Sequence, residues 1–258
     1  MGWQTFLITT DTHGELIDKD YERRILGWIK DHKPKRIFHL GDVFDMSSIR
    51  RGASSEERSH SLSEDIHKGL AYLRKLQEAS PASNLEAITW GNHDYRLFNM
   101  AESTREGLEF DYARMLRKEI EKNVAVIGCA TRDYDVERGW YEIAPRGSRS
   151  GPKLIGHGYA ATISPARTAC QHWGSTITGH VHRFDTHQND DLGRNESYVI
   201  ACGCQIAQDY NRTHRRRLSH SVGFGWGVTN DRTGDWIVWF IKRNKEGTWL
   251  DPKKHQMK

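Results

Sequence analysis

Ten acidic, amide and imidazole side chains in five short segments of this chain have the types and spacing to hold metal ions. Glycines stand beside nearly all of them, and glycine permits tight turns and a close approach of the backbone. Several carboxylates packed together repel one another, and burying an unpaired charge is costly, so two divalent cations would stabilise the cluster. The ten residues are Asp11, His13, Asp42, Asp45, Asn92, His93, Asp94, His157, His180 and His182.

The donor types restrict the metal. Imidazole combined with carboxylate or amide oxygen, without thiolate, suits manganese, iron, zinc or nickel. A carboxylate shared between two ions would hold them about 3.5–4 Å apart, the spacing of two-metal hydrolytic sites. We take two divalent ions as the expected cofactor, with manganese as the first choice and iron, zinc or nickel as alternatives.

Each segment follows a short apolar run that indicates a β-strand. We predict these strands over residues 6–10, 36–40, 85–90, 153–155 and 175–178. In open α/β sheets the ligand site lies beyond the carboxyl ends of the strands, so the five segments should converge. Further strands are predicted over residues 124–127, 140–144, 184–187, 197–201, 221–228 and 235–241.

Apolar residues recur at helical spacing over residues 20–31 and 62–79, and helices are also predicted over 109–121 and 165–172. Residues 46–61 are rich in Ser, Arg and Glu, which predicts a loop. The sequence shows no internal repeat or linker. We therefore expect one domain over residues 1–243 and a polar tail over 244–258.

Taken singly, each segment has an ordinary explanation. A type I turn explains Gly-Asp-x-x-Asp, and a solvated strand end explains Gly-His-Val-His. The ordered series, with every member placed after a strand, favours a metal site instead.

This series resembles the calcineurin-like metallophosphoesterase superfamily, in its nuclease and phosphodiesterase branches, which include small bacterial or phage-encoded enzymes. The matching blocks are Asp11-Thr12-His13, Gly41-Asp42-Val43-Phe44-Asp45, Gly91-Asn92-His93-Asp94, Gly156-His157 and Gly179-His180-Val181-His182. The resemblance implies an α/β fold of two packed mixed β-sheets flanked by helices, a four-layer sandwich.

The resemblance also implies a role for each residue. One metal would be held by Asp11, His13 and His182, and the second by Asn92, His157 and His180. Asp42 would bridge the two ions. His93 would contact the phosphate and protonate the leaving oxygen, and Asp94 would orient His93 by accepting its other ring N–H. Asp45 is expected to support the site or its turn.

Two metals would lower the pKa of a bridging water and offset charge in an in-line transition state. No nucleophilic serine or cysteine is then needed. The resemblance departs from protein phosphatases at one point, because Met46-Ser47 follows Asp45 where that branch has Arg-Gly. This departure argues against a phosphoprotein substrate.

Basic and aromatic residues near the blocks are candidates for substrate binding. Arginine forks fit phosphate oxygens, and aromatic rings stack on bases. The alternatives are solvated loops for the arginines and core packing for the rings. The candidates are Arg50, Arg51, Arg215, Arg216, Arg217, Tyr159 and Trp173.

Composition excludes several classes of protein. Charged residues make up 28% of the 258 residues and hydrophobic residues 36%, which excludes disordered and collagen-like chains. The net charge of +4 is no strong polyanion signature. Four cysteines are too few for a disulfide framework and indicate reduced thiols. Without an apolar run of roughly 18 residues or a leader-like segment, we expect a cytoplasmic enzyme without membrane contact.

The sequence predicts a metal-dependent phosphodiesterase acting on nucleic acid or nucleotides. One alternative is a phosphomonoesterase for a small nucleotide or a phosphoprotein. Another is a catalytically inactive scaffold that keeps the fold for partner binding, although the intact ligand set argues against it. The oligomeric state is left open.

Overall fold

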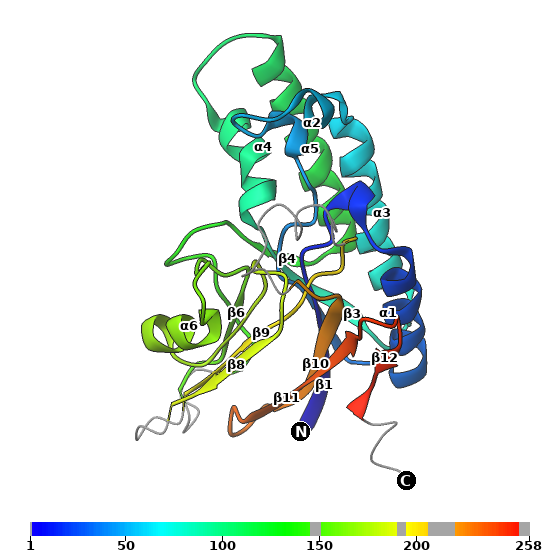
Figure 1. Cartoon of the computed structure of the whole chain (residues 1–258), viewed down its shortest axis with the longest axis vertical. Coiled ribbons are helices and arrows are strands. Elements are labelled where there is room, and N and C mark those ends of the chain that lie inside the picture. The colour runs from blue at the N-terminus through cyan, green and yellow to red at the C-terminus, as the bar shows by residue number, and fades with distance from the viewer. Residues whose placement is uncertain (1, 145–150, 190–194, 206–219, 253–258) are drawn as a thin grey trace.

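Two mixed β-sheets pack face to face between helices in the computed structural model, which describes residues 2–144, 151–189, 195–205 and 220–252 (Figure 1). This arrangement is the α/β sandwich of two mixed sheets that the sequence predicted. Among the described residues, none of the helices has the length and apolar character needed to cross a membrane.

The larger sheet has the strand order β12-β11-β10-β1-β2-β3-β4. Neighbouring strands are parallel from β1 to β4 and antiparallel from β1 through β10 and β11 to β12. The strands are β1 (Trp3–Thr9), β2 (Arg36–His39), β3 (Asn84–Thr89), β4 (Ala130–Arg132), β10 (Gly223–Asn230), β11 (Trp236–Arg243) and β12 (Trp249–Leu250).

The smaller sheet has the order β5-β6-β7-β9-β8. Its three central strands, β6, β7 and β9, are parallel, and an antiparallel strand closes each edge. The strands are β5 (Tyr141–Glu142), β6 (Leu154–Gly156), β7 (Thr176–Thr178), β8 (Asp185–Gln188) and β9 (Glu196–Val199).

Helices form the two outer layers. Helices α1 (Lys19–His32), α3 (Leu62–Glu78), α4 (Asn92–Glu102) and α5 (Leu108–Ile127) contribute to the core on one side of the larger sheet, while α6 (Pro165–Trp173) packs on the smaller sheet. Helices α4 and α5 extend away from the sheets at the top of Figure 1. The remaining helical turns are η1 (Gly14–Leu16), η2 (Ser47–Ile49) and α2 (Ser55–Ser59).

Side-chain alternation along the central strands divides the core in two. Successive side chains of a strand point to opposite faces. In β1, Leu7 lies in the cluster shared with the helices, whereas Phe6 and Ile8 lie in the cluster between the sheets. In β2, Ile37 and Phe38 separate in the same way. Strands β1, β2 and β3 are therefore buried on both faces, and the loops that follow them begin from the core.

The structure corrects several predicted elements. Residues 124–127 are the last turn of α5 and not a strand, because Leu116, Ile120 and Val124 continue the buried helical stripe until Gly128 ends it with a φ of 79°. The predicted loop over 46–61 contains η2 and α2, the latter begun by a Ser54–Glu57 capping box. Helix α4 was not predicted.

The expected tail over 244–258 begins inside the fold. Strand β12 pairs with β11, and the Trp249 indole N–H donates to Asp20 at 2.7 Å. The buried Asp251 accepts a hydrogen bond from Arg24 at 3.0 Å. The sheet thus continues beyond the predicted domain boundary at residue 243.

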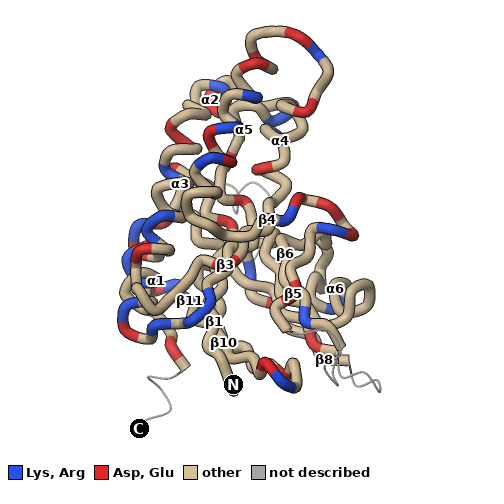
Figure 2. Tube along the Cα trace, turned by 180° about the vertical axis from the view of Figure 1, so that it is seen from behind, with Lys and Arg blue, Asp and Glu red and all other residues tan. Residues whose placement is uncertain are grey.

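Charges of both signs are interspersed along the helical layer, as expected from the small net charge (Figure 2).

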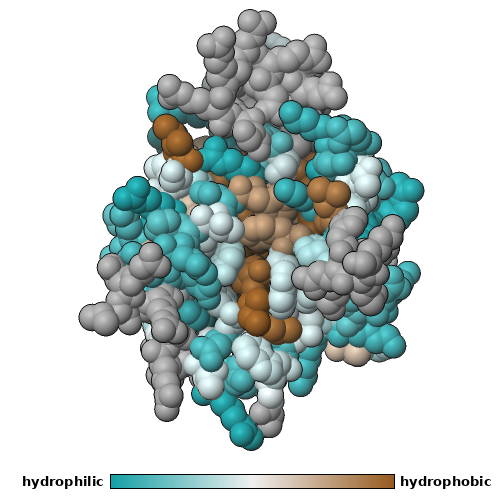
Figure 3. Space-filling model, turned by 60° about the horizontal axis from the view of Figure 1, so that its bottom comes forward, coloured by the Kyte–Doolittle hydropathy of each residue, from teal (hydrophilic) through white to brown (hydrophobic). Residues whose placement is uncertain are grey.

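On the lower face, apolar residues gather in a central strip with hydrophilic residues on both sides (Figure 3). This face lies at the end of the molecule where β1 begins, away from the loops that follow β1.

Candidate metal centre

The predicted ligands lie in loops that follow β1, β2, β3, β6 and β7, where the two sheets meet. The backbone N–H groups of Thr12 and His13 both donate to Asp42 O at 3.0 Å, which joins the first two loops. Gly179 N donates to His157 O at 2.9 Å and joins the last two. His180 N donates to an Asp11 carboxylate oxygen at 3.0 Å, so one bond crosses from the smaller sheet to the larger.

Two groups of metal-ligand atoms share Asp42. One contains Asp11, His13, Asp42 and His182, and the other contains Asp42, His157 and His180, with the ligand atoms of each group within 4.8 Å of one another. Asn92 Oδ1 lies 3.0 Å from His157 Nε2, beside the second group. The structure therefore brings together all seven residues predicted as ligands.

Ring nitrogens in both groups face other potential ligands at short range. His13 Nε2 lies 3.3 Å from His182 Nε2, and His157 Nε2 lies 3.1 Å from His180 Nδ1. His182 Nε2 lies 3.2 Å from Asp11 Oδ1, which is buried and receives no hydrogen bond from the described residues. A buried carboxylate oxygen without a hydrogen bond, facing imidazole nitrogens, fits a site for a cation.

Backbone strain concentrates in these loops. Seven described non-glycine residues have a positive φ, between 47° and 73°, and five of them are predicted ligands. Such conformations cost of the order of 1–3 kcal/mol each and cluster at functional sites. The five are Asp11, His13, Asp42, His180 and His182.

The carboxylates and His180 have charges that suit metal binding, whereas Asp11 outweighs burial and raises the pKa of His182 well above its ordinary value. Burial raises the pKa of Asp11 and of Asp42, but neighbouring histidines outweigh it and hold both pKa values below the ordinary range. Burial and the nearby His157 lower the pKa of His180 to about 4. Anionic carboxylates and a neutral imidazole are the forms that bind cations.

A second layer of contacts orients the ligands. His157 Nδ1 donates to Leu40 O at 2.7 Å, so the proton is on Nδ1 and Nε2 keeps its lone pair for the centre. His13 Nδ1 faces Asp45 Oδ1 at 3.1 Å. Asp45 also forms a group of potential ligands with His13 and His93, so its expected supporting role stays a prediction.

His93 lies beside Asp42. Its backbone N–H donates to Asp42 Oδ1 at 2.8 Å, and its ring Nε2 is 4.0 Å from Asp42 Oδ2. Burial lowers the pKa of His93, but Asp42 and Asp45 outweigh burial and raise the pKa above its ordinary value. A raised pKa favours the protonated ring, which is the form that can give a proton to a leaving group.

The predicted bond between Asp94 and the His93 ring is wrong. His93 Nδ1 instead donates to Asp45 O at 2.6 Å. The Asp94 carboxylate accepts backbone N–H bonds from Gly91 at 2.9 Å, Phe44 at 2.9 Å and Val43 at 3.3 Å. Asp94 is on the first turn of α4, where its side chain points back to the backbone and joins the second loop to the third.

The residues predicted to bind substrate are less closely tied to the centre. Arg50 forms an ion pair with Glu57 at 2.7 Å, and Arg51 is exposed. Tyr159 stacks on Tyr134 with ring centroids 4.8 Å apart, and Trp173 packs 5.1 Å from Trp140. The remaining candidates, Arg215, Arg216 and Arg217, lie outside the described residues.

Among the described residues near the centre, the sequence analysis missed Tyr134 and His220, whose rings lie 5.8 Å from His157 and 4.9 Å from His182, and three others. Asp65 on α3 accepts the N–H groups of Asp45 and Met46 at 2.9 Å, and its signal was an acid on a buried helix face. Arg96 donates to Asp45 O at 3.1 Å and would have been found had α4 been predicted. Cys204 lies with His13 and His182, and no sequence signal indicated it.

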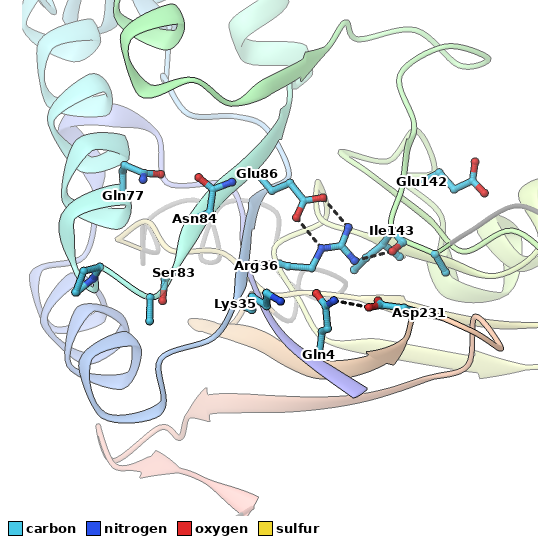
Figure 4. A pocket seen from close by; sticks show the side chains of 13 residues that line it. Gln4, Lys35, Arg36, Gln77, Ser83, Asn84, Glu86, Glu142, Ile143 and Asp231 are labelled. Atoms are coloured by element: carbon cyan, nitrogen blue, oxygen red, sulfur yellow. Dashed lines mark hydrogen bonds and ion pairs between the residues drawn. The ribbon is translucent and has the colours of Figure 1, made fainter. Parts of the chain in front are cut away.

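A cavity of about 870 Å³ lies elsewhere, beside the first residues of β2 and β3 (Figure 4). Arg36 there forms two bonds of 2.6 Å to Glu86, and Gln4 donates to Asp231. The residues that line this cavity include none of the predicted site residues. It is therefore distinct from the metal centre.

Comparisons with known proteins found similar chains by sequence and by structure. "Gene 54 protein" of Mycobacterium phage D29 is 28% identical over 186 residues, which cover 69% of this chain and 68% of the phage protein. A novel archaeal phosphodiesterase of known structure has a TM-score of 0.47 at 14% identity, over 92% of this chain and 99% of its own. Vacuolar protein sorting 29 from Cryptosporidium parvum has a TM-score of 0.48 at 12% identity, over 97% and 96%.

The family model for the calcineurin-like phosphoesterases matches residues 4–202, which include all five blocks. The strands before those blocks, the two sheets and the shared position of Asp42 agree with this match. The chain belongs to the calcineurin-like phosphoesterase family.

Proposed function

We propose that this chain is a phosphodiesterase that depends on two metal ions and acts on nucleic acid or nucleotides. The observation that carries the proposal is the pair of ligand groups that share Asp42, one of its oxygens 3.4 Å from His157 and 3.9 Å from His13. In this proposal Asp11, His13 and His182 hold one ion. Asn92, His157 and His180 would hold the other, and Asp42 would be shared by both.

The bound ions would supply Lewis acidity toward phosphoryl oxygens and toward the attacking water. Residues of the chain supply the rest of the chemistry. His93 Nε2 gives its proton to the leaving oxygen, since Nδ1 is held by Asp45 O and only Nε2 faces the centre. Asp94 holds the loops on which Asp42 and His93 stand. Manganese remains the first choice of metal within this proposal.

Preference for a nucleotide rests on the aromatic residues beside the second ligand group. The Tyr134 ring lies 5.8 Å from the His157 ring and stacks on the Tyr159 ring. The Tyr159 ring in turn lies 5.9 Å from the Trp173 ring. Tyr159 and Trp173 are partly exposed. Base–aromatic stacking contributes about 1–3 kcal/mol per base, so this edge suits a base next to the scissile phosphate.

The arginines remain predictions. Since Glu57 already binds the Arg50 guanidinium, we expect Arg51→Ala to raise KM for an oligonucleotide more than Arg50→Ala does. Initial-rate kinetics on one oligonucleotide measures both variants. For Arg215, Arg216 and Arg217 we keep the proposal of a phosphate clamp, tested by the salt dependence of oligonucleotide binding.

The test of the function compares two substrates after removal and return of metal. We expect Mn²⁺-loaded protein to hydrolyse bis-p-nitrophenyl phosphate faster than p-nitrophenyl phosphate, with about two ions bound per chain by elemental analysis. The reverse preference supports a phosphomonoesterase. Metal binding without hydrolysis of either substrate supports an inactive scaffold, and absence of bound metal contradicts the proposed centre.

A further inference from the structure

The segment Cys202-Gly203-Cys204 lies against the loop that carries the first ligands. Gly203 N donates to Thr10 O at 3.0 Å and to Asp11 O at 3.2 Å, and Gly203 O accepts from Asp18 N at 3.0 Å. Cys204 pairs with Ile17 in an isolated bridge. These bonds fix the cysteine segment beside Asp11 and His13, although about 190 residues separate the two in sequence.

Glycine is required at the centre of this segment because the backbone comes so close. A Cβ atom on Gly203 would lie 2.5 Å from a Tyr21 ring carbon and 2.9 Å from Thr12 Cγ2. Both neighbours are buried. The close packing holds the backbone of this segment against Thr12 and Tyr21.

The thiol of Cys204 is directed to the first ligand group. Its sulfur and one ring nitrogen each from His13 and His182 lie within 4.8 Å of one another. Cys204 is buried, with 5% of its surface exposed. Asp11 Oδ1, the buried oxygen that receives no hydrogen bond, lies 3.2 Å from His182 Nε2 in the same place. The same two imidazoles also form a group with Asp11 and Asp42, so the Cys204 sulfur adds a soft donor of the kind that zinc accepts beside the first ligand group.

Cys202 lies in a different position. Its sulfur is 3.3 Å from Ser221 O and 3.8 Å from Cys204 O, and both are backbone acceptors for a thiol S–H. Cys202 also neighbours the His182 ring, but it belongs to none of the ligand groups found among the described residues. Of the two thiols, which also interact with each other, Cys204 is therefore the one placed in a ligand group among the described residues.

We propose that the Cys204 thiolate is a further ligand of the metal held by Asp11, His13, His182 and the shared Asp42, so that this half of the centre prefers zinc to manganese. The inference rests on the proposed metal centre and refines it. Binding replaces the S–H bond with a sulfur–metal bond, and the proton passes to solvent. Thiolate is a soft ligand that selects zinc over hard ions such as manganese, whereas the other half keeps nitrogen and oxygen ligands only.

Cobalt substitution reads out the sulfur ligand without any activity assay. We expect metal-stripped wild type loaded with Co²⁺ to show a near-ultraviolet sulfur-to-cobalt charge-transfer band. Cys204→Ser should lose the band while retaining bound cobalt. Cys202→Ser should retain it, as should Cys170→Ser, which changes a buried thiol on α6 away from the site. Competition dialysis should show Zn²⁺ affinity of Cys204→Ser lower by about 10–100-fold, with a smaller change for Mn²⁺.

X-ray absorption of zinc-loaded wild type gives a second test that needs no variant. We expect a sulfur shell at about 2.3 Å beside nitrogen and oxygen at about 2.0–2.1 Å. Three results would overturn the cysteine ligand and leave the metal centre intact. They are bound cobalt without the charge-transfer band, a band that survives in Cys204→Ser, and a zinc shell without sulfur. If neither cobalt nor zinc binds, the proposed centre and the cysteine ligand fail together.

Discussion

Individual residues at the metal centre are held in conformations that cost free energy and that the surrounding bonds enforce. Asp42 has a φ of 47°, yet its carbonyl accepts two N–H groups and its carboxylate accepts the His93 N–H. Replacing such a residue therefore alters both the ligand and the loop. Tests at residue scale need variants that separate these two effects.

His93 allows that separation, because it is placed to act on substrate and is not among the predicted ligands. We expect His93→Gln to bind as much metal as wild type and to lose about 10²–10⁴-fold in kcat on a dinucleotide, whose alkoxide leaving group needs a proton. The loss in kcat on bis-p-nitrophenyl phosphate should be much smaller, because the p-nitrophenolate leaving group does not need a proton. The exposed His67→Gln on α3 is the matched control. Equal loss on both substrates would remove His93 from the acid role.

Asp94 is predicted to act through stability. Asp94→Ala leaves three buried backbone N–H groups without an acceptor, and each such loss costs about 1–3 kcal/mol. We expect the free energy of unfolding in urea to fall by about 3 kcal/mol or more. Asp135→Ala also removes an acceptor of two backbone N–H groups, but water can replace it at the surface, so its effect should be much smaller. Equal stability of Asp94→Ala and wild type contradicts the assignment.

At the scale of elements, helix α3 fixes the second loop through a close contact at Gly69. A Cβ atom there would lie 2.5 Å from the Phe44 ring and 3.1 Å from Val43 O. Val43 and Phe44 directly follow Asp42, so any shift of the loop moves the bridging carboxylate. The spacing of α3 from the larger sheet thus sets the geometry of the centre.

Gly69→Ala should therefore destabilise the protein by about 1–3 kcal/mol and weaken metal binding. Gly27→Ala on α1 meets no atom within 4 Å and should be neutral or stabilising by about 0.5–1 kcal/mol. Urea unfolding and metal titration measure both variants. If Gly69→Ala binds metal as wild type does, the packing of α3 does not set the position of Asp42.

At the scale of the whole molecule, the centre joins the two sheets. Asp11 and Asp42 follow strands of the larger sheet, while His157, His180 and His182 follow strands of the smaller one. His157 Nδ1 to Leu40 O and His180 N to Asp11 are direct bonds across this junction. Bound ions would add further links between the sheets.

Metal removal should therefore lower thermal stability. A ligand at about 100 times its Kd stabilises the native state by about 2.7 kcal/mol, or about 5–10 °C in Tm for a chain of this size. We expect calorimetry to show this fall in Tm when EDTA replaces Mn²⁺. Asp42→Asn should show little difference between the two conditions. A wild-type Tm that is the same with and without Mn²⁺ would mean that the ions do not link the sheets.

The sequence determined the five strand-end segments and the ligand candidates that the structure brings together, while its resemblance to the phosphoesterase family implied the fold class. It could do so because buried strands and polar turns are local patterns, and the carboxyl ends of parallel strands meet at one edge. Tertiary structure alone decided which group orients His93, because Asp94 on the first turn of α4 points back to the loop backbone while the His93 ring donates to Asp45 O. Tertiary structure alone also placed Cys204 beside His13. These residues are distant in sequence, and the backbone hydrogen bonds that bring their segments together follow no local sequence pattern.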